Sequence, residues 1–97
     1  MPRYIALINF TEQGIKTIAD MDKRLAQGRK MLEQAGGKLV EAYLTLGPYD
    51  AVIITEAPDD EAALRAALQY GVAGNGRTVT MRAYTEPEFV RVTKSLT

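Results

Sequence analysis

Residues 38–57, KLVEAYLTLGPYDAVIITEA, decide the fold of this chain. Side chains alternate along residues 38–46 as they do in a half-covered strand, with Val40, Ala42, Leu44 and Leu46 on one face and Leu39, Glu41, Tyr43 and Thr45 on the other. Gly47-Pro48-Tyr49 is a turn, because the proline ring fixes the φ that the second turn position needs. Residues 50–57 form the next strand. Two strands joined by so short a connection predict an antiparallel hairpin.

The flanking segments supply the remaining elements. Their hydrophobic spacing and glycine and proline signals predict a strand at 3–10, a helix at 15–35, a second helix after Pro58, a strand at 77–84 and a short C-terminal helix. The long helix is expected to bend or restart at 19–22, with Asp20 as a second cap. The order βαββαβ plus a helix predicts one α+β, ferredoxin-like domain over residues 1–97. Its four-stranded antiparallel sheet has the first and third strands in the centre and the helices on one face.

The two central strands are apolar on both faces, at residues 5–8 and 51–54. A central strand with water on one side should alternate between apolar and polar residues. At about 25 cal/mol per Å² of apolar area, leaving a four-strand face in water forgoes several kcal/mol and invites aggregation. We therefore expect a second copy to cover that face, giving a homodimer or a higher homo-oligomer. The alternative is that a few apolar side chains are simply exposed.

Composition excludes several classes of site. The chain has no histidine and no cysteine, so the usual zinc, haem, thiol and imidazole chemistry is missing, and its only serine is Ser95. The formal net charge of +0 does not fit a nucleic-acid binder or a membrane-surface protein. The sequence shows no span-length apolar run and no signal-peptide layout. We expect a cytoplasmic protein without cofactor or metal.

Asp50 is the main candidate for a functional site. As a general acid or base it would have a pKa raised by apolar neighbours, with Tyr43 and Tyr49 orienting a ligand and Arg82 holding an anion. As a structural residue it would accept hydrogen bonds from turn amides and fix the hairpin. The polar residues of the edge strands (Glu41, Tyr43, Thr45, Thr78, Thr80, Arg82 and Tyr84) would line either a ligand pocket between two sheets or the rim of an interface.

Three other motifs also have two interpretations each. Thr11 in TEQG is either a helix cap or part of a phosphate-binding helix end. Residues 59–61, Asp-Asp-Glu, form either an acidic first helical turn or a site for a hard cation. Tyr4 and Phe10 are placed like the stacking aromatics of RNA-binding domains, but the neutral charge argues against that function.

Three separated stretches carry a family resemblance: YIALINFTEQGIKTI (4–18), GGKLVEAYLTLGPYDAVIITEAPDDEAA (36–63) and GNGRTVTMRAYTEPEF (74–89). Together they resemble the GYD-domain family, named for a glycine-tyrosine-aspartate motif, here Gly47, Tyr49 and Asp50 with Pro48 between. The resemblance implies a small bacterial or archaeal protein with a ferredoxin-like, dimeric α/β-barrel fold and no established activity. Relatives of that fold include cofactor-independent monooxygenases, decarboxylase-like enzymes and stress-induced binding proteins, but fold alone does not assign a function.

Two functions of different classes follow. The first is a homo-oligomeric protein that binds a small, partly apolar molecule between the two sheets of a dimer. The second is a cofactor-independent enzyme, monooxygenase- or isomerase-like, that uses Asp50 and the tyrosines in that cavity. We favour the first, because histidine and tryptophan are absent and the sequence names no convergent catalytic set.

Overall fold

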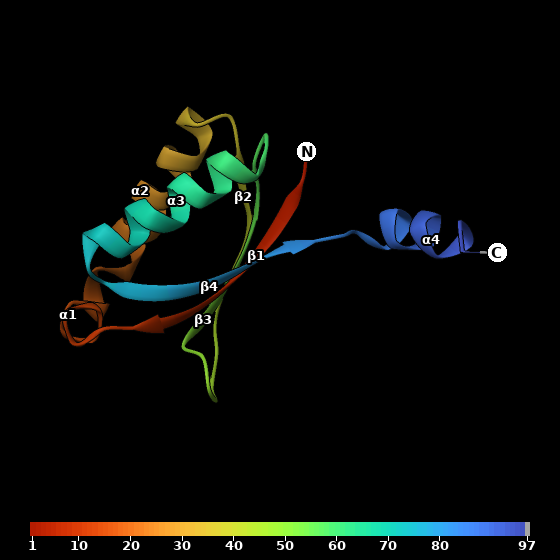
Figure 1. Ribbon diagram of the computed structural model, residues 1–97. Helices are drawn as coiled ribbons and strands as arrows, with labels where there is room; N and C mark the ends of the chain where they lie inside the picture. Colours follow the sequence, from red (N-terminus) through yellow and green to blue (C-terminus); the bar gives the residue numbers. More distant parts are fainter. Residues whose placement is uncertain (97) are drawn as a thin grey trace.

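The computed structural model describes residues 1–96 and shows an α+β domain (Figure 1). Thr97, the last residue of the predicted domain, lies outside the described residues. The elements are β1 (Arg3–Phe10), α1 (Glu12–Lys16), a 3₁₀ turn (Ile18–Asp20), α2 (Met21–Gln34), β2 (Lys38–Leu44), β3 (Ala51–Glu56), α3 (Asp60–Ala73), β4 (Gly76–Ala83) and α4 (Glu86–Lys94).

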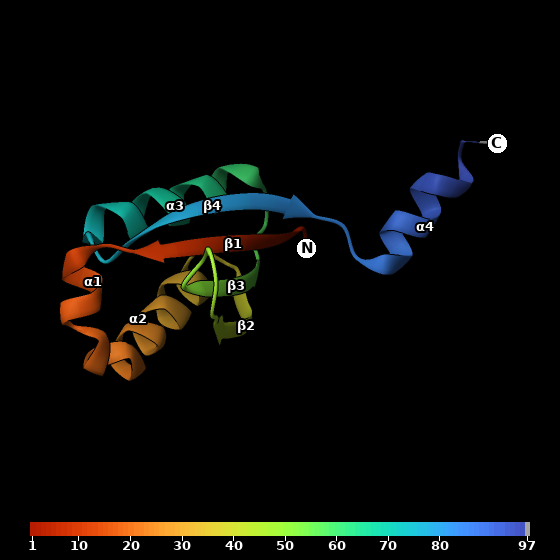
Figure 2. The ribbon, with the colours of Figure 1, turned by 90° about the horizontal axis from the view of Figure 1, so that it is seen from below.

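The four strands form one antiparallel sheet in the order β2-β3-β1-β4, so the first and third strands are central, as expected. In the register of the sheet, Ile5 of β1 lies opposite Ile54 of β3 and Met81 of β4. Helix α2 packs over β2 and α3 over β4 (Figure 2). Figure 1 shows both helices on the same side of the sheet, so within the described part of the chain no helix covers its other side.

The helical region after β1 is broken, as the sequence predicted. Thr11 caps α1, because its hydroxyl accepts a hydrogen bond from the amide of Gly14 at 3.1 Å. The chain then passes through the 3₁₀ turn and restarts as α2 at Met21. Asp20 occupies the N-cap position of α2, as predicted, but its side chain makes no capping hydrogen bond.

The hairpin differs from the prediction in two ways. Its connection runs from residue 45 to residue 50, because β2 ends at Leu44 and β3 begins at Ala51. A register shift between Leu39 and Glu41 also places Leu39 opposite Thr55, while Glu41 lies opposite Ile54. Leu39 therefore shares a face with Ala42 and Leu44, not with Glu41. The cause is a β-bulge, in which one extra residue changes the alternation.

The core is thin. Tyr4, Ile8, Ala51 and Ala57 are the buried apolar residues among those described, with exposures of 4–6%. They lie on the helix side of the sheet, where a cavity of about 350 Å³ remains between the sheet, α2 and α3. The sheet and its two helices are thus held together around incompletely filled space.

Helix α4 projects away from the rest of the molecule (Figures 1 and 2). The described chain measures 52 × 31 × 19 Å and has a radius of gyration of 14.5 Å. A compact domain of this length has a radius of gyration of about 12.5 Å. The projecting helix accounts for the elongated shape.

Candidate functional site

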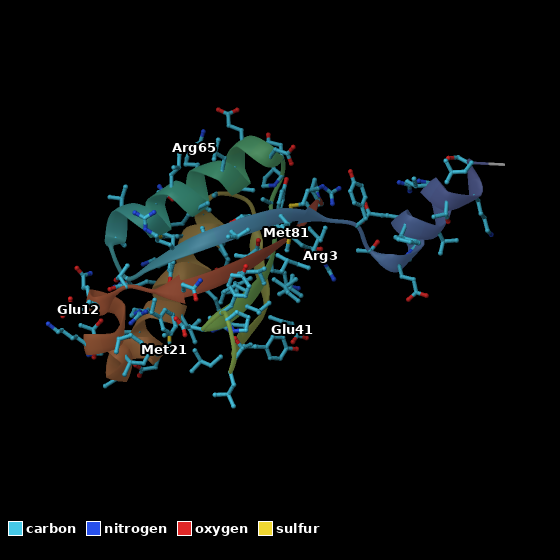
Figure 3. The ribbon with its side chains drawn as sticks, turned by 60° about the horizontal axis from the view of Figure 1, so that its bottom comes forward. Arg3, Glu12, Met21, Glu41, Arg65 and Met81 are labelled. Atoms are coloured by element: carbon cyan, nitrogen blue, oxygen red, sulfur yellow. The ribbon has the colours of Figure 1, made fainter. Side chains whose placement is uncertain are left out.

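The sheet has an apolar face that no helix of residues 1–96 covers. We call it the open face, and its residues are Ile5, Leu7, Tyr43, Val52, Ile54, Val79 and Met81. These residues lie opposite one another across the strands and alternate with Tyr4, Ala6 and Ile8, which face the helices. Figure 3 shows Met81 on the sheet, away from Arg65 on α3. Val79, Met81 and Tyr43 are 52%, 43% and 51% exposed. Large contiguous apolar patches on a protein surface are often interaction sites.

Polar groups border the open face. Arg3 and Glu56 form an ion pair at 3.2 Å at one end of it. On β2, Tyr43 donates a hydrogen bond to the carboxylate of Glu41, and this bond raises the pKa of Tyr43. The Nε of Arg3 is buried without a hydrogen-bond partner among the described residues. An apolar centre with a polar border is the usual anatomy of a protein interface.

The exposed area of the chain is large for a monomer. Residues 1–96 expose 6776 Å². A compact monomer of 10.7 kDa exposes about 5,500 Å². The excess of about 1,300 Å² is larger than the roughly 800 Å² that each partner contributes to a standard interface.

Asp50 joins the hairpin to β1. Its Oδ2 accepts a hydrogen bond from the backbone amide of Phe10 at 2.8 Å. Its own amide donates to the carbonyl of Ile8 at 2.8 Å, and its carbonyl accepts from the amide of Thr45 at 2.9 Å. The side chain is half-buried. The partner predicted for the side chain was an amide of the turn, whereas the observed partner is Phe10, the last residue of β1. Asp50 therefore extends the hydrogen bonding between β1 and β3 by one position beyond the paired residues.

The two other motif residues shape the same corner. Gly47 has φ +121°, a value that residues with a Cβ rarely adopt, so glycine is needed there. The carbonyl of Tyr49 accepts a hydrogen bond from the hydroxyl of Thr45 at 2.6 Å. The glycine, tyrosine and aspartate thus all take part in the backbone conformation of the loop between β2 and β3.

Arg82 does not join the other candidate residues. It lies opposite Tyr4 in the register, whereas Tyr43 lies opposite Val52, so the two are on different faces of the sheet. Its guanidinium lies over the rings of Tyr84 at 4.4 Å and Tyr4 at 5.8 Å, and 3.8 Å from a carboxylate oxygen of Glu88. Thr78 and Thr80 also face the helices. The prediction that this side of β4 looks onto a second sheet is therefore wrong, because Val79 and Met81 hold that face.

The cavity on the helix side was not predicted. Small residues of α3 such as Ala63 and Ala67, together with Gly28 of α2, line it and leave space above the central strands. Alanines and a glycine on the sheet-facing sides of both helices were the available sequence signal. At one margin the buried hydroxyl of Tyr4 donates to Asp60 Oδ1 at 2.6 Å. Burial and this bond raise the pKa of Tyr4 to about 12.

The pattern of the whole chain matches a known family. A sequence profile described as the GYD domain matches residues 4–93. The chain belongs to the GYD-domain family. The family assignment made from the three sequence stretches is thus confirmed.

Two comparisons extend this GYD-domain assignment. The chain is 34% identical over 84 residues to a Thermus thermophilus protein named "Glutamine synthetase and cystathionine beta-lyase binding protein", covering 86% of this chain and 88% of that one. It also resembles the crystal structure of TTHA0845, likewise from Thermus thermophilus, with a TM-score of 0.54 and 22% identity over 88% of this chain and 95% of that chain. The second likeness supports the α+β fold.

The TEQG stretch of this GYD domain, residues 11–14, contacts residues 73–75, which precede β4. Gln13 Nε2 donates to the carbonyl of Ala73 at 3.0 Å and to Asn75 Oδ1 at 2.9 Å. The amide of Thr11 donates to the carbonyl of Asn75 at 3.1 Å. A Cβ on Gly14 would lie 1.9 Å from that carbonyl oxygen, so only glycine fits. The TEQG stretch therefore links the end of β1 to the start of β4 by hydrogen bonds.

The acidic motif at 59–61 has structural partners. The carboxylate of Asp59 caps α3 by accepting from the amide of Ala62 at 2.9 Å, and Asp60 accepts from Tyr4. Within residues 1–96, histidine, cysteine and carboxylate side chains form no group of three suited to a metal ion. Every helix of that part of the chain is too short or too polar to cross a membrane.

Proposed function

We propose that this GYD-domain protein is a binding protein that acts as a homodimer and whose partners are other proteins. The dimer forms by packing the two open faces together, as a ferredoxin-like, dimeric α/β barrel. The observation that carries the assembly is the uncovered apolar sheet face, together with about 1,300 Å² of surface beyond that of a compact monomer. A cytoplasmic location belongs to this proposal, and the lack of cysteines fits it.

The protein-partner part rests on the relative. A protein 34% identical to this chain over 86% of its length is named for binding glutamine synthetase and cystathionine beta-lyase. Catalysis has less support, because Asp50 is engaged by the amide of Phe10 and Arg82 lies on the other face from Tyr43. No two of the four candidate side chains are brought into contact by a hydrogen bond or ion pair of the described structure.

Sedimentation equilibrium between about 1 and 50 µM, the range in which specific dimers of this interface size commonly form, tests the assembly. We expect a mass of about twice 10.7 kDa. Val79→Lys places a charge on the open face and should give a folded monomer, while Val72→Lys on α3, which is 87% exposed, should remain dimeric. A wild-type protein that stays monomeric throughout this range would refute the assembly.

Purified glutamine synthetase and cystathionine beta-lyase from the same organism test the partners. Each is passed over immobilised wild-type protein, and we expect saturable binding of at least one. Immobilised Val79→Lys protein shows whether binding requires the dimer. If wild-type protein is a dimer but binds neither enzyme, the proposal of protein partners is refuted and the homodimer is not.

The cavity favours a second candidate function, the binding of a small, partly apolar molecule. Its volume of about 350 Å³ falls within the range of small-ligand sites. It lies on the helix side of the sheet, however, whereas the pocket predicted from the sequence lies between two sheets. Native mass spectrometry of the purified protein tests this function, and the expected result is a mass above that of the chains alone. Filling the space with Ala67→Leu should remove the added mass, and Leu64→Ala, at an exposed position on α3, should not.

A further inference from the structure

Helix α4 is a well-formed helix that projects away from the rest of residues 1–96. The amide of Thr85 donates to Glu88 Oε1 at 2.8 Å, and the Thr85 hydroxyl lies 3.0 Å from the same oxygen, as in a capping box. Pro87 stands in the first turn and the basic residues Arg91 and Lys94 in the last. The hydrogen bonds from Thr85 lower the pKa of Glu88, with Arg82 contributing. Such signals specify a helix and not a frayed tail.

One apolar stripe runs along α4 and continues to Leu96 in the turn after the helix. Phe89, Val92 and Leu96 follow at spacings of three and four and are 60%, 50% and 79% exposed. Val90, which is 39% exposed, lies on a different side of the helix. In a monomer this stripe faces water, and a helix of nine residues gains too little from its own backbone to be stable without packing.

The junction with β4 directs α4 away from its own domain. Only Tyr84 and Thr85 separate the end of β4 at Ala83 from the start of the helix at Glu86. Arg82 spans this junction, with its guanidinium over the ring of Tyr84 and 3.8 Å from Glu88. Figures 1 and 2 show the resulting direction from two sides. Returning α4 to its own open face would require these contacts to break and the chain to reverse within two residues.

We propose that α4 is exchanged between the two copies of the homodimer: its Phe89–Val92–Leu96 stripe packs on a margin of the second copy's open face, along edge strand β2 or β4, beside the contact between the two sheets. This inference rests on the homodimer proposed above. The exposed area supports a second copy as the occupant. The excess of about 1,300 Å² is larger than the roughly 800 Å² that each partner contributes to a standard interface, so area remains for α4 after the open faces have met. In a two-fold dimer each copy gives one helix and receives one, so both stripes are covered, while the two sheets cover the rest of both open faces.

Exchange can be detected by disulfide trapping, because the chain has no cysteine of its own. One chain carries Val92→Cys and an affinity tag, and the other carries Tyr43→Cys or Met81→Cys on the open face. The chains are mixed, refolded together and oxidised with copper–phenanthroline. We expect a tagged–untagged disulfide with at least one of the two open-face positions. The control chain carries Val90→Cys, which should give at most about one tenth of that product, because a disulfide forms only between closely placed Cβ atoms.

A chain with both substitutions shows where the helix packs. Exchange predicts a covalent dimer, and a helix folded back on its own sheet would give an internal disulfide in a monomer, which would overturn the proposal. Cross-linking of Val92→Cys chains only to each other would overturn it too, because the two helices would then meet one another. If none of the disulfides forms in a protein that sediments as a dimer, the helix exchange is refuted but the homodimer is not.

Affinity gives an independent measure. Val92→Gln should weaken dimerisation by about 10-fold or more, and Val90→Gln should change it by less than about 2-fold, with the same helix content by circular dichroism. Equal effects of the two substitutions would overturn the exchange. A monomeric wild-type protein would instead remove the homodimer on which the exchange rests.

Discussion

Replacing Asp50 by alanine tests whether the aspartate of the GYD motif stabilises the fold. The substitution removes the oxygen that accepts from the Phe10 amide at 2.8 Å and leaves that amide without its partner at the end of β1. Losing a half-buried hydrogen bond to a charged acceptor costs about 1–2 kcal/mol. For a domain of this size, each kcal/mol lowers Tm by about 4–8 °C. Asp50→Asn keeps an acceptor oxygen and should lose less than half as much.

The assay is urea unfolding followed by far-UV circular dichroism. Protein concentration must be the same for all variants, because the stability of a dimer depends on concentration. Asp20→Ala is the matched control, since Asp20 makes no side-chain capping bond. A free energy of unfolding for Asp50→Ala within about 0.5 kcal/mol of wild type would refute the structural role. The carboxylate would then be free for binding or catalysis.

Three further substitutions test other contacts. Tyr4→Phe should lower the free energy of unfolding by about 1 kcal/mol at pH 7. Since burial raises the pKa of Tyr4 to about 12, the stability that wild type gains from this hydroxyl is complete below about pH 10 and is lost as pH rises through 12. Denaturation of both proteins across that pH range measures this difference. Gly14→Ala should lower the free energy of unfolding by about 1–3 kcal/mol, because the new Cβ overpacks against Asn75. Gly28→Ala should stabilise α2, because no atom lies within 4 Å of the position of its Cβ. Equal changes of Tm for the two variants would contradict this. Gly47→Ala should lower stability by about 1 kcal/mol or more because of its φ of +121°, and an unchanged urea midpoint would count against that strain.

Local sequence signals predicted most of the elements. Thr11 before α1, Pro58 before α3 and the glycines after α2 and α3 gave starts and stops that the structure confirms within a few residues. The βαββαβ order correctly predicted that the first and third strands lie at the centre of the sheet. These signals depend on neighbours in the chain, so a single sequence contains them.

The rest depends on contacts between distant residues. The bulge at Leu39 and Glu41 changes which side chains share a face, and alternation alone does not reveal it. Arg82 was assigned to the wrong face because the register of β4 against β1 comes from pairing, not from β4 itself. The partner of Asp50 is forty positions away at Phe10, so the turn sequence could not indicate it. The cavity arises from the spacing of two helices over the sheet, which no local pattern specifies.

The position of β1 in the sheet has a consequence for the synthesis of the protein. β1 is the first strand to be made, yet one of its two neighbours is β4, which pairs Phe10 with Gly76 and Arg3 with Ala83. Until β4 leaves the ribosome, a central apolar strand has one unpaired backbone edge, and such edges promote aggregation. The hydrogen bonds from Gln13 and Thr11 to residues 73–75 lie next to the Phe10–Gly76 pair, where β1 ends and β4 begins. They fix the register of the two strands from that end. We therefore expect nascent chains that stop before residue 76 to be the form most dependent on chaperones.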